Sequence, residues 1–109
     1  MSDRPRRLRV GPFLWQVKWS QIEVLRYAPA GDACGTTHHP DLVIAIQPGR
    51  AEDYNRSILL HELLHACARA ADLQAPEDTE ETVVAALTGP LLQALRDNPA
   101  LLEYLTGPS

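Results

Sequence analysis

Two histidines flank a glutamate in the segment His61-Glu62-Leu63-Leu64-His65. In a helix, residues four apart lie on the same face, so both imidazoles can approach one metal ion. Glu62 lies beside this pair, close enough to hold a metal-bound water. An H-E-x-x-H pattern within a helix is the signature of zinc-dependent hydrolases. The spacing therefore predicts a metal site with His61 and His65 as ligands and Glu62 as general base.

The residues around the motif predict a helix that is buried on most sides. Between residues 58 and 71 most side chains are apolar, and the polar ones fall within one arc about 100° wide. The polar residues of this stripe are His61, Glu62, His65, Arg69 and Asp72. A solvated stripe is the alternative interpretation, but solvated helix positions usually carry Lys, Glu, Gln or Arg. The composition of the stripe favours a metal site.

Two histidines leave the metal short of protein ligands, because catalytic zinc normally takes three and keeps a fourth place for water. The extended pattern with a downstream glycine and a third histidine is excluded, since those positions are Ala68 and Ala71. The remaining common solution is a carboxylate from the next helix. The acidic segment 76–81 supplies several.

Glu81 is the predicted third ligand. It precedes Val84 by three residues and Thr88 by seven, so it can share an inward helical face with them. A structural role is the alternative, because Glu81 would complete a capping box if Asp78 capped this helix. Glu80 is the alternate ligand.

Three segments resemble the small zincin-like proteins of phage genomes and bacterial prophages, which are related in pattern to the ImmA/IrrE and SprT-type metallopeptidases. The segments are the motif at 61–66, a glutamate before the valines at 83–84, and the stretch at 96–99. The resemblance covers roughly residues 12–106 and is specific at the histidine motif.

This resemblance implies a minimal gluzincin, in which His61, His65 and a glutamate hold zinc and Glu62 acts as base. The chain departs from the ImmA/IrrE pattern directly after Glu81, where Thr82-Val83 replaces the usual Ala-Asn. The resemblance thus implies the chemistry and leaves the substrate open.

The expected activity is hydrolysis of a peptide bond in a peptide or protein substrate. Zinc would lower the pKa of its water toward neutrality, and Glu62 would move the proton from that water to the leaving amine. Candidates for a second electrophile are Tyr54, Tyr104, His38 and His39. Two other functions stay open: a zincin-fold binding or regulatory module with little turnover, and a protein in which zinc only joins two helices.

The elements that must position this chemistry begin with a sheet. Residues 13–19 alternate around Trp15 and Val17 and predict a strand, and residues 22–27 predict a second one. A hairpin is expected over residues 34–46, with its turn at 38–41. The expected fold class is α+β, with a mainly antiparallel sheet of three or four strands followed by a helical half.

Three helices are expected in the second half. The motif helix would be capped by Asp53 or Asn55 and would run to about Asp72. The next helix would start near residues 78–79 and break or kink at residues 89–90, because proline lacks the N–H donor. Asn98 and Pro99 would then begin a short final helix.

The 109 residues suit one domain, expected over residues 12–109 after a flexible basic arm at residues 1–11. The net charge of -4 argues against nucleic-acid binding, and no apolar run could span a membrane. No secretory signal is evident, so a cytoplasmic location with reduced thiols is expected. Cys67 is expected to be buried as a small apolar group, on the side of its helix opposite His65.

Overall fold

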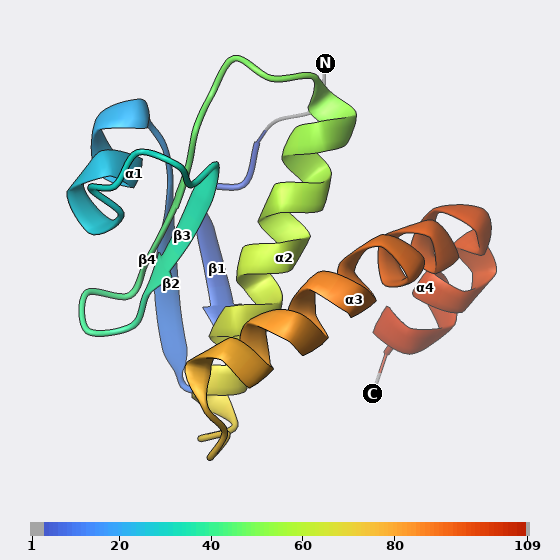
Figure 1. The fold of residues 1–109 in the computed structure, drawn as a ribbon. Helices are drawn as coiled ribbons and strands as arrows, with labels where there is room; N and C mark the ends of the chain where they lie inside the picture. Colours follow the sequence, from blue (N-terminus) through green and yellow to red (C-terminus); the bar gives the residue numbers. More distant parts are fainter. Residues whose placement is uncertain (1–3, 109) are drawn as a thin grey trace.

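A computed structural model describes residues 4–108 of the chain (Figure 1). The elements in chain order are β1 (Arg7–Val10), β2 (Phe13–Trp19), α1 (Gln21–Tyr27), β3 (Gly35–His38), β4 (Val43–Ile46), α2 (Glu52–Ala70), α3 (Glu77–Asp97) and α4 (Pro99–Thr106). The predicted α+β class is confirmed, because a small sheet is followed by a helical half. Within residues 4–108, none of the helices combines the length and the apolar character needed to cross a bilayer.

The four strands form one mixed sheet in the order β1-β2-β4-β3. β1 and β2 pair antiparallel, and so do β3 and β4, which confirms the hairpin predicted over residues 34–46. β2 and β4 are parallel at the centre of the sheet. The sheet is therefore mainly antiparallel, and β3 forms the edge that borders the site described below.

The prediction of a second strand over residues 22–27 is wrong, because this segment forms α1. The Ser20 hydroxyl oxygen accepts a hydrogen bond from the backbone N–H of Glu23 at 3.3 Å. Ser20 and Glu23 have the S-x-x-E spacing of a capping box, a local signal that favours a helix start over a strand. Since α1 packs on the sheet at β4, the chain crosses one face of the sheet before it returns.

Side chains alternate between the two faces of a sheet along a strand, and all four residues of β4 are buried. The core therefore has one cluster on each face of the sheet. On one face, Val43 and Ala45 pack against Val24 of α1. On the other face, a larger cluster joins the sheet to α2, and its buried members are Val10, Trp15, Val17, Ile44, Ile46 and Ala66. Figure 1 shows α1 and α2 on opposite sides of the sheet. One side of α2 is thereby held on the sheet, and its polar side is left to meet β3 and α3.

The expected flexible arm at residues 1–11 is wrong for its second half. Residues 7–10 form β1, which pairs with β2, so the domain does not begin at residue 12. Arg4 forms an ion pair with Glu52 at 2.7 Å, and the Trp19 indole N–H donates to the Pro5 carbonyl at 2.9 Å. Arg4 is thus held by a contact with α2 that a sequence pattern of charges does not reveal. Residues 1–3 lie outside the described part of the chain.

The helix starts differ from the predicted caps. α2 begins at Glu52 after Ala51, so Asp53 and Asn55 both lie inside its first turns. The buried Asn55 side chain instead donates to the Arg50 carbonyl at 3.2 Å. α3 begins one residue earlier than expected and follows Pro76, which makes no side-chain cap.

Of the break or kink predicted at residues 89–90, the break does not occur, because α3 runs from Glu77 to Asp97 with Pro90 inside it. Proline removes one backbone hydrogen bond, the one to the carbonyl of Ala86. Both residues are exposed, so water can hydrate that carbonyl. Asn98 and Pro99 begin α4 as predicted, although the Asn98 amide donates backward to the Ala94 carbonyl at 2.9 Å and not into α4.

Candidate metal centre

The polar stripe of α2 forms one wall of a cleft. His61 and His65 lie one turn apart, and their ring centroids are 5.0 Å from each other. Apolar residues on the opposite side of α2 pack onto the sheet, so the rings are directed away from the core. The four-residue spacing thus places two imidazoles side by side, as the sequence predicts.

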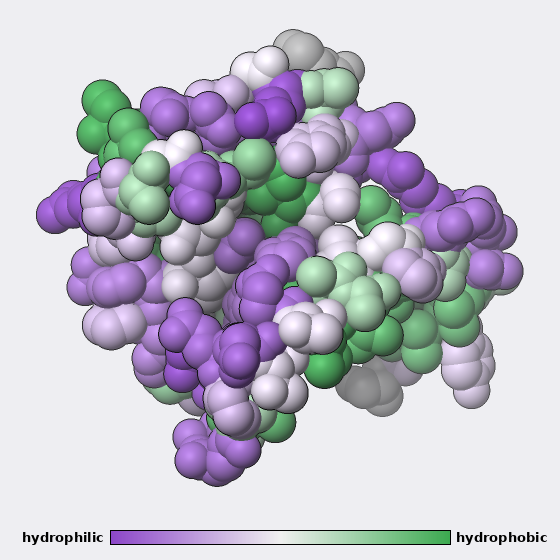
Figure 2. Space-filling model, in the orientation of Figure 1, coloured by the Kyte–Doolittle hydropathy of each residue, from purple (hydrophilic) through white to green (hydrophobic). Residues whose placement is uncertain are grey.

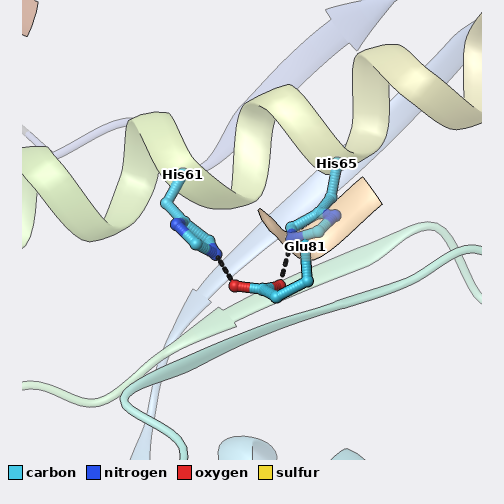
Figure 3. A group of neighbouring side chains, drawn as sticks. All are labelled: His61, His65 and Glu81. Carbon is cyan, nitrogen blue, oxygen red and sulfur yellow. Dashed lines mark hydrogen bonds and ion pairs between the residues drawn. The ribbon is translucent and has the colours of Figure 1, made fainter. Parts of the chain in front are cut away.

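Glu81 of α3 faces both imidazoles (Figure 3). One carboxylate oxygen lies 2.9 Å from Nε2 of His61, and the other lies 2.7 Å from Nε2 of His65. The ligand atoms of these three residues all lie within 4.8 Å of one another. The structure therefore brings together the three residues predicted as ligands, and this group could hold a metal ion.

Glu80, the alternate ligand, occupies a different position on the same histidine. Its carboxylate accepts a hydrogen bond from Nδ1 of His65 at 2.5 Å, on the ring edge opposite Glu81. A carboxylate at this nitrogen fixes the ring orientation and raises the basicity of the other nitrogen, as carboxylates behind metal-bound histidines do. Glu80 is buried, whereas the Glu81 side chain is 54% exposed. The two adjacent glutamates thus have separate roles at His65.

His65 has carboxylate oxygens against both ring nitrogens, and this favours the doubly protonated imidazolium. Burial by itself lowers the pKa of His65, but the hydrogen bonds to Glu80 and Glu81 outweigh it and raise the pKa above the usual value. A divalent cation bound to Nε2 of His65 would take the place of the proton that this nitrogen now shares in its hydrogen bond to Glu81. The same donor set thus fits a metal ion.

Glu62 is buried against β3, with 7% of its surface exposed. The Thr37 hydroxyl donates to Oε1 of Glu62 at 2.7 Å and lies 3.0 Å from the Glu62 backbone carbonyl. Burial raises the pKa of Glu62 above its usual value, and the Thr37 hydrogen bond and the nearby histidines oppose that rise. The Glu62 carboxylate is therefore held in one orientation beside the two imidazoles, with most of its own surface shielded from solvent.

Gly35 allows β3 to approach α2 this closely. A Cβ at residue 35 would lie 2.7 Å from Cγ2 of Ile58 and 3.3 Å from Oε2 of Glu62. Any side chain would therefore push the edge strand away from the helix and move Thr37 from Glu62. Neither Gly35 nor Thr37 was among the predicted site residues. A glycine inside a strand pattern was the available signal, since it often marks a close backbone approach.

The cleft around this group has a volume of about 980 Å3. Its walls come from the segment before β3, from β3 itself, from α2 and from the first turns of α3. The lining residues include Cys34, Gly35, Thr37, Tyr54, His61, Glu62, His65, Glu80 and Glu81. Of the four candidate electrophiles only Tyr54 is among the lining residues, and its hydroxyl lies 4.0 Å from the Cys34 sulfur.

The other three candidates lie elsewhere. The ring of His38 stacks on Tyr27 at 4.4 Å, and His39 packs edge-on against Phe13 at 5.3 Å. Tyr104 is on α4 and is 85% exposed. These histidines have packing roles that explain their presence at the end of β3.

The two cysteines are both free. The expectation that Cys67 is buried is wrong, because it is exposed on α2. The residues of α2 that pack on the sheet centre on Ala66, and Cys67 lies about 100° around the helix from Ala66, beside this face. Cys34 is half-buried at the rim of the cleft.

The donor set agrees with zinc chemistry, since imidazole nitrogens and one carboxylate oxygen are common ligands of catalytic zinc. The chain was also compared with protein families, curated proteins and solved structures, and none of them matches it. The site therefore has to be interpreted from its own geometry.

Proposed function

We propose that this protein is a zinc-dependent metallopeptidase. The observation that carries the proposal is the convergence of His61, His65 and Glu81 beside the buried carboxylate of Glu62 in an open cleft. Zinc held by these three residues would act as a Lewis acid and would lower the pKa of a coordinated water to about 7. A phage or prophage origin, as the sequence resemblance implies, belongs to the same proposal.

The number of donors supports a catalytic site over a structural one. Structural zinc is almost always held by four protein ligands, whereas catalytic zinc has three and one open position. Within residues 4–108 the group has three donors. It also borders a cleft that a substrate can enter, which a site that only joins two helices does not require.

Glu62 is the proposed general base. Its Oε1 is occupied by the Thr37 hydroxyl, and no described residue donates a hydrogen bond to its Oε2. Oε2 can therefore accept the proton of the attacking water and return it to the leaving amine. Thr37 acts through Glu62 by holding its orientation, so it is a positioning residue.

The substrate would be a flexible or unfolded peptide segment. The cleft lies between the edge strand β3 and the first turns of α3, and it is open to solvent. A folded protein presents few segments that can enter such a space. Tyr54, which lies in the cleft wall, is the proposed second electrophile.

The experiment combines metal analysis with hydrolysis of an unfolded protein. Protein purified without chelator is expected to contain about one zinc per chain. It should cleave the substrate, and chelator should stop the cleavage. Glu62→Gln keeps size and helix preference, so it should retain zinc and lose at least about 100-fold in rate.

Two outcomes would contradict the proposal in different ways. Zinc content near zero after zinc supplementation would remove the metal site. Full zinc content without hydrolysis of any unfolded substrate would favour a zinc-bearing binding or regulatory module. Asp32→Asn, in the cleft wall but outside the proposed ligands and base, is the matched control and should retain both zinc and activity.

A further inference from the structure

The second half of α3 and all of α4 lie outside the core. The last buried residue of α3 is Thr88, and α4 has none. Figure 1 shows α3 leading away from the sheet and α2, with α4 folded back beside its end. An isolated helix shorter than about 12 residues is marginal in water unless packing supports it. The eight residues of α4 therefore lack the burial that would normally stabilise them.

α3 carries an apolar stripe that has no partner within the described chain. Its members follow the i, i+3, i+4, i+7, i+8, i+11 spacing of a helix-packing face; they are Val83, Ala86, Leu87, Pro90, Leu91 and Ala94. All are exposed except Ala94, which is half-buried. A stripe with this spacing usually faces a core or another helix, and here it faces solvent.

α4 enlarges the apolar surface. Within residues 4–108, seven of the twelve exposed large hydrophobic residues belong to α3 and α4; they are Val83, Leu87, Leu91, Leu101, Leu102, Tyr104 and Leu105. Figure 2 shows apolar side chains gathered over α4 and the adjoining side of α3. Their exposures run from 37% to 85%, which amounts to roughly 600 Å2 if each side chain offers about 150 Å2. A standard interface buries about 800 Å2 on each partner, of which about 65% is apolar in homodimers, so the apolar area is large enough for one.

The charges of this region indicate which partner fits. Residues 82–108 contain Arg96, Asp97 and Glu103, three of the chain's 24 charged residues (10 basic and 14 acidic). Arg96 is already paired with Asp53 of α2 at 3.2 Å. Nucleic acid or an anionic membrane would require a basic face, which residues 82–108 do not provide.

A second copy of the chain meets these conditions. Two copies of a protein with a net charge of -4 repel each other over most of their surface. Residues 82–108 contain few charged side chains, so two copies can meet through the exposed apolar side chains of α3 and α4 with few like charges brought together. A two-fold axis requires only one self-complementary patch, and identical ridges can pack into the grooves of the partner helix.

We infer that the chain forms a two-fold dimer in which the α3 stripes of two copies pack against each other and α4 flanks the contact. The cleft lies at the opposite end of α3, around Glu80 and Glu81, so it stays open in the dimer. The dimer is independent of the proposed activity and of zinc.

Sedimentation velocity of the full chain over a range of concentrations tests this inference. The wild-type protein is expected at twice the 12.0 kDa monomer mass. Leu87→Lys and, separately, Leu105→Lys should weaken the dimer at least about 100-fold, because each buries an unpaired charge twice in a two-fold contact. Leu105 is 64% exposed, so its substitution is tolerated by the monomer fold even if Leu87→Lys is not.

Ile22→Lys is the matched control. Ile22 is 77% exposed on α1, and its substitution adds the same charge away from α3 and α4. It should leave the dimer intact, and circular dichroism should show native helix content for all three variants. A wild-type chain that stays monomeric up to about 100 μM overturns the inference. So does a dimer that both α3–α4 variants leave unchanged.

Discussion

The two halves of α3 differ in what they bury and what they expose. The first half, from Glu77 to Thr88, places one buried carboxylate and one half-exposed carboxylate against His65. The second half and α4 expose large apolar side chains and bury none. Both halves reverse the usual distribution, in which charged groups are solvated and large apolar groups are covered.

Each reversal has its own explanation in binding. Buried carboxylates cost free energy unless hydrogen bonds or a cation compensate, and the first half supplies both imidazole partners and a place for zinc. Exposed apolar stripes of this size mark contact surfaces. The turn with Glu80 and Glu81 would therefore bind a metal ion, and the exposed stripe from Val83 to Ala94, together with α4, would bind another copy of the chain.

The largest expected effect separates the two glutamates of the first half. Glu81→Gln removes a proposed zinc ligand, so zinc affinity should fall more than about 100-fold. Glu80→Gln removes only the carboxylate behind His65, and about a 10-fold loss is expected, in the range seen for such outer partners. Competition with a chromophoric chelator measures both affinities. If Glu80→Gln were the weaker binder, the two glutamates would have the opposite roles.

Removal of zinc should destabilise the first half. The proposed ligands lie on α2 and α3, so the metal would join these helices, and zinc at 100 times its Kd would add about 2.7 kcal/mol of stability. Chelation is then expected to lower Tm by on the order of 10 °C. Hydrogen exchange should increase in Glu77–Thr88. His65→Ala provides the control, because its melting curve should no longer respond to chelator.

A melting curve of the wild-type protein that ignores chelator would show that zinc does not join the two helices. Loss of protection only in residues 89–106 would also contradict the comparison, since those residues lie outside the metal centre.

Thr37 tests how strongly the buried carboxylate depends on its donor. Thr37→Val keeps the branched shape but leaves Glu62 without the hydroxyl, so the zinc-free protein should lose about 1–3 kcal/mol in urea unfolding. Thr37→Ser keeps the hydroxyl and should lose less. Equal losses in the two variants would mean that packing of the strand, and not the hydrogen bond, holds this part of the cleft.

The smallest effects compare the core side of α3 with its exposed surface. Val84 is buried, and Val84→Ala should cost about 2 kcal/mol of unfolding free energy. Leu105→Ala should change the stability of the monomer by less than about 0.5 kcal/mol. Urea unfolding must be run at a protein concentration below that of dimer formation. A large loss for Leu105→Ala under these conditions would show that α4 belongs to the monomer core.

The sequence by itself determined the features that depend on local periodicity. The four-residue repeat of a helix places His61 and His65 together wherever α2 packs, and the two-residue repeat of a strand places Trp15 and Val17 in the core. The structure brings Glu81 to both histidines as predicted, but the inward face expected for it is occupied by Glu80, which is buried with Val84 and Thr88. Zinc and hydrolysis remain predictions.

Other local signals compete with each other, and the sequence did not resolve them. Residues 22–27 were predicted to form a strand, while the Ser20–Glu23 spacing favoured the helix that forms. Pro90 predicted a break or a kink, but a single lost hydrogen bond at an exposed position does not end a helix whose first half is packed. In both segments the two alternative local structures differ little in free energy, so the packing of the rest of the molecule decides which one forms.

Only the tertiary structure decided which residues surround the motif. Thr37 meets Glu62 from a strand 25 positions away in the sequence, and Gly35 permits that contact. Glu80 and Glu81 are neighbours with the same chemistry, so only the angle at which α3 crosses α2 assigns them to opposite edges of His65. Contacts between elements depend on how the whole core packs, and a periodic pattern in one element carries no information about them.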